Sequence, residues 1–362
     1  MRGIVFDGEK LRLIDDLEGP DPGPGEVEIA IQASGVCHSD LSVVSGTIAF
    51  PTPVVLGHEG AGIVSRIGPA VTTLSVGDPV ALVTLGQCGA CPACDSGRPT
   101  LCRETFGKRP TPFRVKGRPY HNFANLSTFA ERIGVKANQA IRIPKEVPFA
   151  SAALIGCGVL TGAGAVFNRA KVLPGDSVVV IGAGGIGLNV IQAARIAGAH
   201  PIIVLEPNRE KEALARRMGA TDFVDPIAEG DAVAAVKART EGWGAKHVFE
   251  CVGAKRLMED AIRMADWGGN VVLIGVAPPD TKVEFLPLST LLDITIMGCR
   301  YGTSQPQKDV KRICELYLAG RLELDALVSK RYPLADFEHL VEDMEAGRIA
   351  RGVLDMPGAA GV

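Results

Sequence analysis

Near its N-terminus the chain carries four adjacent residues that are all capable of chemistry, Cys37-His38-Ser39-Asp40. Thiolates and imidazoles bind metal ions, a hydroxyl can relay a proton, and a carboxylate can orient a metal-bound imidazole. The same residue types also occur in ordinary turns, where a carboxylate caps the chain. These four residues alone leave the three roles open.

A second cluster consists of four cysteines in the spacing C-x2-C-x2-C-x7-C: Cys88, Cys91, Cys94 and Cys102. Two-residue gaps let neighbouring thiolates converge on one ion, and four thiolates complete the tetrahedral set of a structural Zn²⁺. Iron–sulfur clusters use similar spacings, but the nearby Gly57-His58-Glu59 and the nucleotide motif described next favour zinc. Three further cysteines lie in apolar strand or helix patterns and are expected in the core: Cys251, Cys299 and Cys314.

The third motif is glycine-rich. VVVIGAGGIG places Gly182, Gly184 and Gly187 in G-x-G-x-x-G spacing between an apolar strand pattern and a helical pattern, and the next predicted strand ends in Glu206. In this context the motif predicts a dinucleotide site, because glycines let the backbone approach a pyrophosphate at a helix N-terminus. A carboxylate at Glu206 can accept hydrogen bonds from the ribose hydroxyls and repel a 2′-phosphate, which favours NAD over NADP.

Two kinds of segment must position these residues. Before about residue 149 the pattern is β-rich, because EVEIAIQA alternates apolar and polar residues after the turn cluster GPDPGPG. After residue 151, six β segments alternate with helical segments, which predicts a doubly wound parallel sheet. We therefore expect a β-rich domain over 1–158, a nucleotide-binding domain over 159–300, and a C-terminal segment over 301–362 that returns to the first domain.

Composition excludes several classes of partner. The chain has 362 residues, 46% hydrophobic and 22% charged, and a formal net charge of −3. This charge gives no reason to expect nucleic acid or a membrane surface as partner. The first residues of the chain lack the apolar segment of a signal peptide. The apolar stretch 178–199 is interrupted by polar residues, so we do not expect it to span a membrane. We expect a cytoplasmic protein with cysteines that are free thiols or metal ligands.

Five motifs occur in order along the chain: Cys37-His38-Ser39-Asp40, GHEGAGIV (57–64), the four-cysteine cluster, GCGVLTG (156–162) and the glycine-rich motif. Together they resemble the zinc-dependent medium-chain alcohol dehydrogenases over essentially the whole chain. The resemblance implies an α/β protein with a GroES-like β-rich catalytic domain, including a structural-zinc lobe at about 86–103, and a Rossmann domain. It also implies NAD, two Zn²⁺ per chain, and the reversible oxidation of primary alcohols to aldehydes.

The resemblance assigns Cys37, His58 and Cys157 to the catalytic zinc. Three protein ligands leave one position for water or substrate, where the metal makes an alcohol easier to deprotonate and the nicotinamide accepts the hydride. Ser39 matches the proton relay and Asp40 the carboxylate behind the histidine ligand. Glu59 matches a carboxylate that approaches the zinc or supports its surroundings. The resemblance also implies cofactor contacts by His38, Thr161, Gly182, Gly184, Gly185, Ile186, Gly187, Glu206, Lys211 and Arg351. Of these residues, His38 and Arg351 are expected to face the pyrophosphate.

Two positions depart from the pattern of many family members. Thr84, four residues before Cys88, replaces a bulky aromatic residue, so we expect a wider substrate pocket that includes Ile48 and favours larger allylic or aromatic alcohols. Ser42 replaces a histidine that passes the proton to solvent, and serine does not titrate near neutral pH. The relay is therefore expected to end through Ser39, the cofactor ribose and water, or to use His38.

Other functions and the oligomeric state stay open. The loop Arg103–Arg118 carries six cations against Glu104 and can attract an anionic substrate, as in the related thiol-dependent formaldehyde dehydrogenases. A non-catalytic zinc- and NAD-binding sensor is a further alternative, although such a protein is expected to lose ligands that are retained here. The resemblance implies a small alcohol or aldehyde substrate and a homodimer or homotetramer, with 291–299 as a possible pairing edge.

Overall fold

The computed structural model describes residues 1–104 and 107–357, which divide into two compact units. Unit 1 contains Met1–Cys157, Gln305–Gly320 and the described residues from Leu324 onward, whereas unit 2 contains Gly158–Ser304 and Arg321–Glu323. Nearly all of the described C-terminal segment thus belongs to the same unit as the N-terminal part of the chain. Residues 358–362 of the expected C-terminal segment lie outside the described residues.

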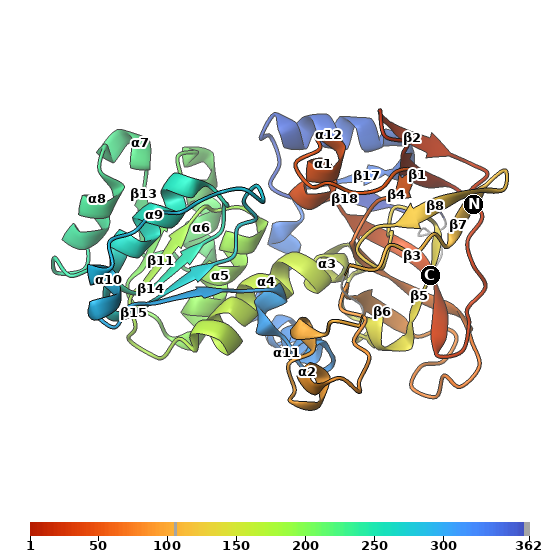
Figure 1. The fold of residues 1–362 in the computed structure, drawn as a ribbon, viewed down its shortest axis with the longest axis horizontal. Helices are drawn as coiled ribbons and strands as arrows, with labels where there is room; N and C mark the ends of the chain where they lie inside the picture. The colour runs from red at the N-terminus through yellow and green to blue at the C-terminus, as the bar shows by residue number, and fades with distance from the viewer. Residues whose placement is uncertain (105–106, 358–362) are drawn as a thin grey trace. The chain divides into compact units, whose positions relative to one another are not determined.

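Unit 1 contains two sheets (Figure 1), whose strands are β1 (Gly3–Phe6), β2 (Leu11–Ile14), β3 (Glu26–Gly35), β4 (Val54–Val55), β5 (Glu59–Ile67), β6 (Pro79–Leu82), β7 (Phe113–Val115), β8 (Arg118–Asn122), β9 (Arg132–Lys136), β10 (Ala140–Arg142), β17 (Lys330–Pro333) and β18 (Gly352–Asp355). The strand orders are β2-β1-β4-β8-β7 and β10-β6-β5-β3-β18-β17, with β9 also paired to β3. Val27, Ile29 and Ile31 of β3 are buried, and so are the polar residues Glu28 and Gln32, so this strand is buried on both faces and not on one face as its alternation predicts. Because β18 pairs antiparallel with β3, the C-terminal segment is part of this sheet.

Helices are short in the N-terminal part of unit 1. The longest described helix before residue 149 has seven residues, in keeping with the β-rich pattern. The α-helices of this unit are α1 (His38–Val44), α2 (Pro92–Asp95), α3 (Phe149–Ala153), α11 (Pro306–Leu318) and α12 (Phe337–Glu345). Its 3-10 turns are η1 (Pro99–Leu101), η2 (Ala137–Gln139), η7 (Asp325–Leu327) and η8 (Leu334–Asp336).

Unit 2 is built on one parallel sheet, formed by β11 (Val178–Ile181), β12 (Ile202–Leu205), β13 (Asp222–Val224), β14 (Ala245–Glu250), β15 (Ala265–Leu273) and β16 (Thr295–Gly298). The order is β13-β12-β11-β14-β15-β16, and every neighbouring pair is parallel. From β11, the chain first adds strands on one side of the sheet (β12, β13) and then on the other side (β14, β15, β16). Strand β11 leads into the glycine-rich motif. This strand order is the arrangement of a dinucleotide-binding Rossmann sheet, and the predicted α/β fold class is confirmed.

The connections of unit 2 are helical. They are α4 (Leu160–Gly164), the π-helical η4 (Ala165–Ala170), α5 (Gly185–Ala197), η5 (Arg209–Lys211), α6 (Glu212–Met218), α7 (Pro226–Glu229), α8 (Ala232–Ala238), α9 (Lys255–Met264), α10 (Leu288–Leu291) and η6 (Tyr301–Thr303). The chain passes from unit 1 to unit 2 within a further π-helical turn, η3 (Ile155–Val159). None of the described helices is long and apolar enough to cross a membrane.

Candidate functional site

The first candidate site is formed by ligand atoms of Cys37, His58, Glu59 and Cys157, which all lie within 4.8 Å of one another. Strands β3 and β5 explain part of this convergence, because their antiparallel register places Gly35 opposite Glu59. The residues just after β3 and just before β5 therefore meet at one edge of the sheet. All four residues belong to unit 1.

Cys157 reaches the same place through the close approach of η3 to β6. A Cβ at Gly156 would lie 1.8 Å from the carbonyl oxygen of Leu82. Only glycine permits that approach, since no real Cβ contact is so short. Gly156 thus lets η3 pack against β6. This packing places the thiol of the next residue, Cys157, in the cluster.

Asp40 accepts hydrogen bonds from three groups at or next to the metal-site residues. Its Oδ1 accepts hydrogen bonds from His58 Nδ1 at 3.1 Å and from the Gly57 amide at 3.0 Å, and its Oδ2 accepts one from the Cys37 amide at 3.1 Å. Asp40 thereby caps the start of α1 and also fixes the imidazole ring, so that both roles considered for it are present. With Nδ1 engaged, Nε2 of His58 is the nitrogen left for a metal ion.

The charged and polar groups of this cluster shift one another's pKa values. A hydrogen bond from Cys157 lowers the pKa of the Cys37 thiol well below its usual value, with Arg351 and His58 adding to the effect against burial. Burial alone would lower the pKa of His58, but the Asp40 carboxylate and Cys157 raise it well above the usual value. Two thiols and one oriented imidazole are a donor set suited to zinc, so these residues fit the ion that the sequence predicts.

Glu59 and Arg351 form a buried ion pair beside the cluster, a contact that the sequence did not indicate. Arg351 Nη1 lies 3.1 Å from Glu59 Oε1, and the two residues are 6% and 0% exposed. Burial raises the pKa of Glu59 to about 7, although Arg351 opposes this shift. Neither Glu59 oxygen has an aligned hydrogen bond within the described residues. The expected pyrophosphate contact of Arg351 stays a prediction.

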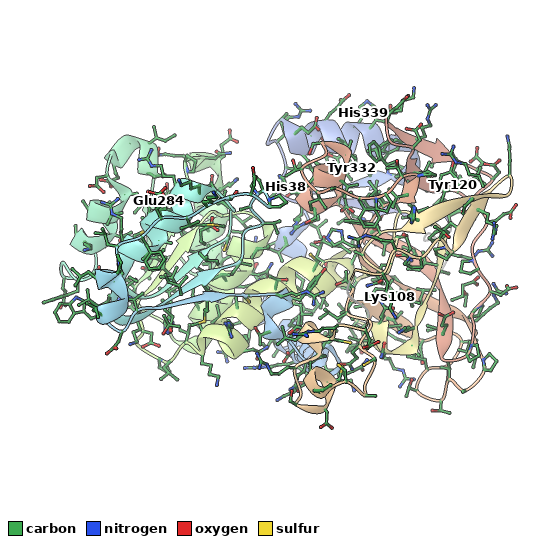
Figure 2. The ribbon with its side chains drawn as sticks, viewed as in Figure 1. His38, Lys108, Tyr120, Glu284, Tyr332 and His339 are labelled. Carbon is green, nitrogen blue, oxygen red and sulfur yellow. The ribbon has the colours of Figure 1, made fainter. Side chains whose placement is uncertain are left out.

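The three polar residues around α1 differ in their surroundings. Ser39 Oγ lies 3.8 Å from Cys37 Sγ, which places its hydroxyl next to a predicted zinc ligand. His38 is exposed at the start of α1 (Figure 2). Ser42 lies one turn further along, where its backbone oxygen accepts hydrogen bonds from Ser45 Oγ and the Ile48 amide. The geometry therefore favours Ser39 over Ser42 as the hydroxyl nearest to the reacting group.

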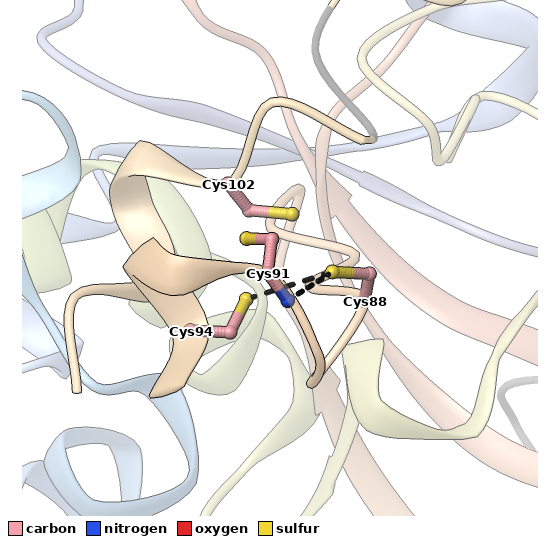
Figure 3. A group of neighbouring side chains, drawn as sticks. All are labelled: Cys88, Cys91, Cys94 and Cys102. Atoms are coloured by element: carbon pink, nitrogen blue, oxygen red, sulfur yellow. Dashed lines mark hydrogen bonds between the residues drawn. The ribbon is translucent and has the colours of Figure 1, made fainter. Parts of the chain in front are cut away.

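The four-cysteine cluster converges as its spacing predicts. All four Sγ atoms lie within 4.8 Å of one another (Figure 3). Cys88 and Cys94 are 3.9 Å apart at sulfur, and the Cys91 amide donates to Cys88 Sγ at 3.3 Å. Zn–S bonds of about 2.3 Å in a tetrahedron imply S···S separations of about 3.8 Å. The residues therefore fit a closed structural zinc site.

We predict that Cys94→Ser reduces the zinc content by one ion per chain and lowers Tm by at least about 5 °C. The reason is that the binding energy of a structural zinc also stabilises the fold around it. Metal analysis and calorimetry measure the two effects. Ser96→Ala, at an exposed position one residue after α2, is the matched control. An unchanged zinc content in Cys94→Ser would show that this cluster binds no zinc.

The predicted dinucleotide motif has the close backbone contacts that its glycines allow. Gly182 has φ +93°, and a Cβ at Gly187 would lie 1.8 Å from the Gly182 carbonyl oxygen. Gly184 is the N-cap of α5, and Gly185 and Ile186 form the first turn of this helix. The amides at this helix start are the groups that bind a pyrophosphate. Thr161 lies on the buried helix α4 of the same unit.

Glu206 is held at the end of β12 by the same loop. Its Oε2 accepts a hydrogen bond from the Ala183 amide at 2.9 Å and pairs with Lys211 Nζ at 3.0 Å, while its Oε1 accepts from the Asn208 amide at 3.1 Å. Glu206 is 6% exposed. The carboxylate is therefore held beside the motif, with Lys211 next to it. The ribose contact of Glu206 and the cofactor contact of Lys211 stay predictions.

Two exposed valines near the glycine-rich motif were not indicated by the sequence. Val252 and Val276 follow β14 and β15 and are 51% and 69% exposed. Val252 Cγ2 lies 2.6 Å from the position of a Cβ on Gly182, and a Cβ on Gly253 would lie 2.5 Å from the Val276 oxygen. The side chain of Val252 thus lies beside Gly182 of the glycine-rich motif, whereas Val276 packs its backbone against Gly253. Only the strand order, which places β14 beside β11, could have indicated Val252.

The two candidate pocket residues have different environments. Thr84 is 4% exposed, and its Oγ1 has no hydrogen-bond partner within the described residues. Ile48 is partly buried and packs against the core of unit 1. The structure adds Phe123, whose ring meets the His58 ring edge-on at 5.5 Å. Sequence reasoning missed Phe123 because a lone aromatic residue after a strand has no distinguishing pattern.

Comparisons with known proteins agree with this geometry. Residues 23–145 match the family described as alcohol dehydrogenase GroES-like domain, and residues 185–318 match the family described as zinc-binding dehydrogenase. The S-(hydroxymethyl)glutathione dehydrogenase of Synechocystis sp. is 37% identical over 97% of this chain and 98% of its own length. The alcohol dehydrogenase zinc-binding domain protein of Burkholderia ambifaria superposes with a TM-score of 0.93 at 35% identity, covering 98% of both chains. Benzyl alcohol dehydrogenase of Acinetobacter calcoaceticus gives 0.91 at 31% identity, covering 98% of this chain and 99% of its own.

Proposed function

The chain belongs to the zinc-dependent medium-chain alcohol dehydrogenases, and we propose that it oxidises larger primary alcohols, aromatic ones among them, to aldehydes. Its cofactors are NAD and two zinc ions. The observation that carries the proposal is the cluster of Cys37, His58 and Cys157, with the imidazole fixed by Asp40.

Each residue of this cluster has a definite task in the reaction. Cys37, His58 and Cys157 would hold the catalytic zinc, which supplies Lewis acidity that lowers the pKa of an alcohol hydroxyl while NAD supplies the hydride acceptor. Ser39, beside Cys37 Sγ, takes the substrate proton at its Oγ and passes its own proton on. Asp40 keeps the His58 ring in one tautomer and one orientation.

The substrate class follows from the size of Thr84. We expect benzyl alcohol to be oxidised with a kcat/KM at least about tenfold above that of ethanol, because a wider apolar pocket gains free energy from the larger substrate. Initial rates with NAD measure this ratio. Thr84→Phe should narrow the pocket and move the ratio toward ethanol. A wild-type enzyme that oxidises ethanol far more efficiently than benzyl alcohol would contradict the proposal.

A second candidate function comes from the curated relative. The Synechocystis protein bears the name S-(hydroxymethyl)glutathione dehydrogenase, and the basic loop 103–118 could attract such an anionic thiol adduct. Formaldehyde oxidation that appears only with added glutathione, at a kcat/KM above that of benzyl alcohol, would favour this candidate. A protein that binds NADH but turns over neither substrate would be the non-catalytic sensor.

Glu206 is expected to set the cofactor preference. Glu206→Gln removes the charge that repels a 2′-phosphate and weakens the ribose contacts, and hydrogen bonds to a charged group contribute about 1.5–3 kcal/mol. We predict that kcat/KM with NAD falls about tenfold and that the value with NADP rises. Steady-state kinetics with both cofactors measure the change. Glu210→Gln, an exposed glutamate on η5, is the control. An unaltered NAD-to-NADP ratio in Glu206→Gln would refute this role.

We also propose a cytoplasmic homodimer. Strand β16 is at one end of its sheet, and an edge strand offers unpaired backbone groups to a second copy. Leu291, just before this strand, is 78% exposed. A molar mass of two chains in solution would support the dimer, and a mass of four chains would support the tetramer.

A further inference from the structure

Glu250, the last residue of β14, carries a buried carboxyl group that has no part in the proposed reaction. It is 0% exposed, and its Oε1 accepts hydrogen bonds from the Val252 amide at 2.9 Å and from the Gly253 amide at 2.8 Å. Its Oε2 has no hydrogen-bond partner within the described residues. Burial raises the pKa of Glu250, although these two amides and that of Ala254 oppose the shift. The amides of the loop after β14 therefore compensate for the burial of this group.

The backbone of Glu250 binds a second loop. Its carbonyl oxygen accepts hydrogen bonds from the Ile274 amide at 2.9 Å and from the Gly275 amide at 3.0 Å, just after β15. The two loops are in close contact, because a Cβ on Gly275 would lie 2.0 Å from the Gly253 nitrogen. One residue thus joins the loops that follow two neighbouring parallel strands, β14 and β15.

The loop after β14 lies beside the glycine-rich motif. Strands β11 and β14 are parallel neighbours, so the loops that follow them meet at the same carboxyl end of the sheet. There Val252 Cγ2 lies 2.6 Å from the position of a Cβ on Gly182, the first glycine of the motif. Dinucleotides bind outside the carboxyl ends of the strands in such a sheet. The loop that the Glu250 side chain holds therefore borders the expected cofactor site.

We propose that Glu250 is a positioning residue for the cofactor, which holds the loop 251–254 in place beside Gly182. Because its side chain is fully buried, it acts through this loop and not by contact with NAD. The inference rests on NAD as the cofactor and is independent of which alcohol is oxidised. When the amides of Val252 and Gly253 lose their acceptor, the loop becomes free to leave its place. NAD binding must then order the loop again, and the cost of this ordering weakens the binding.

Variants of Glu250 in the zinc-loaded protein test this role. Glu250→Met removes the acceptor at a similar side-chain volume, and we expect it to raise Kd for NADH about tenfold, measured by the fluorescence of the bound nicotinamide. KM for NAD should rise similarly, with kcat at or above the wild-type value and KM for benzyl alcohol unchanged. Glu250→Gln should keep Kd within about threefold of wild type, because it retains an oxygen at the place of Oε1. Glu250→Asp withdraws the acceptor by one methylene group and should also raise Kd, so it decides the question if Glu250→Met does not fold.

Asp176 provides the matched control, because it is a carboxylate at the opposite end of the same strands. It accepts a hydrogen bond from the Leu173 amide at 2.8 Å and pairs at 2.9 Å with His247, near the start of β14. Asp176→Ala should lower Tm by at least about 3 °C, since it removes both contacts, but should leave Kd for NADH unchanged.

The outcomes separate this inference from the proposed function. Equal rises of Kd in Glu250→Met and Asp176→Ala would reflect a general loss of stability and would overturn the positioning role. A wild-type Kd in folded Glu250→Met or Glu250→Asp would overturn it as well, while the proposed alcohol oxidation would stand. If the wild-type protein itself does not bind NADH, the cofactor assignment and the inference fail together.

Discussion

Cys157→Ala is expected to reduce alcohol oxidation at least about a thousandfold and to lower the zinc content from two ions per chain to one. The thiol of Cys157 is one of the three ligands of the candidate catalytic site, and a site with two remaining protein ligands binds zinc poorly. Loss of the metal removes several kcal/mol of transition-state stabilisation. Metal analysis of the purified protein and initial rates with benzyl alcohol and NAD measure the two effects.

The chain offers a matched control for this variant. Cys314 is also a buried cysteine of unit 1, but it lies in α11 and belongs to neither metal cluster. Cys314→Ala should keep both zinc ions and most of the activity, since it removes only one sulfur atom from the core. If Cys157→Ala retained two zinc ions and wild-type rates, the assignment of the catalytic ligands would be wrong.

Ser39→Ala is expected to lower kcat at least about a hundredfold, because general acid–base steps contribute factors of about 10²–10⁴. Its Oγ lies 3.8 Å from the sulfur of Cys37, close to where the substrate hydroxyl must bind. Ser42→Ala should change kcat by less than about twofold. Steady-state kinetics with benzyl alcohol, together with zinc analysis to show an intact metal site, measure both variants.

The comparison of the two serines decides how the proton leaves. Equal losses in Ser39→Ala and Ser42→Ala would mean that the relay passes through both residues. A normal rate in Ser39→Ala would remove Ser39 from the mechanism. His38 is exposed on the same helix, and a pH–rate profile that changes in His38→Gln would identify it as the next member of the relay.

Much of the fold follows from local patterns in the sequence. The six β segments predicted after residue 151 correspond to β11–β16. Strands β11 and β12 are buried along their whole length, and a strand buried on both faces needs a continuous apolar run. The four cysteines converge as expected, because two-residue gaps place neighbouring thiols on one ion. Ligands far apart in the chain, such as Cys37 and Cys157, were assigned only through the family resemblance.

Contacts made by tertiary packing could not be predicted. The pair Glu59–Arg351 depends on β18 pairing with β3, and no local pattern specifies which strand the C-terminal segment joins. The stacking of Arg109 on Phe50 likewise depends on how the loop after the four-cysteine lobe returns to β8. Both contacts join residues that are distant in the sequence, and each depends on the path of the whole chain.

The most direct test of the account is the rate of benzyl alcohol oxidation with NAD, measured before chelation, after complete removal of zinc, and after zinc is restored. Zinc content is determined at each stage, so that the rate is compared with the metal present. We predict that activity disappears with the metal and returns when zinc is added back. Zinc-free protein that oxidises the alcohol at the original rate would contradict the central claim.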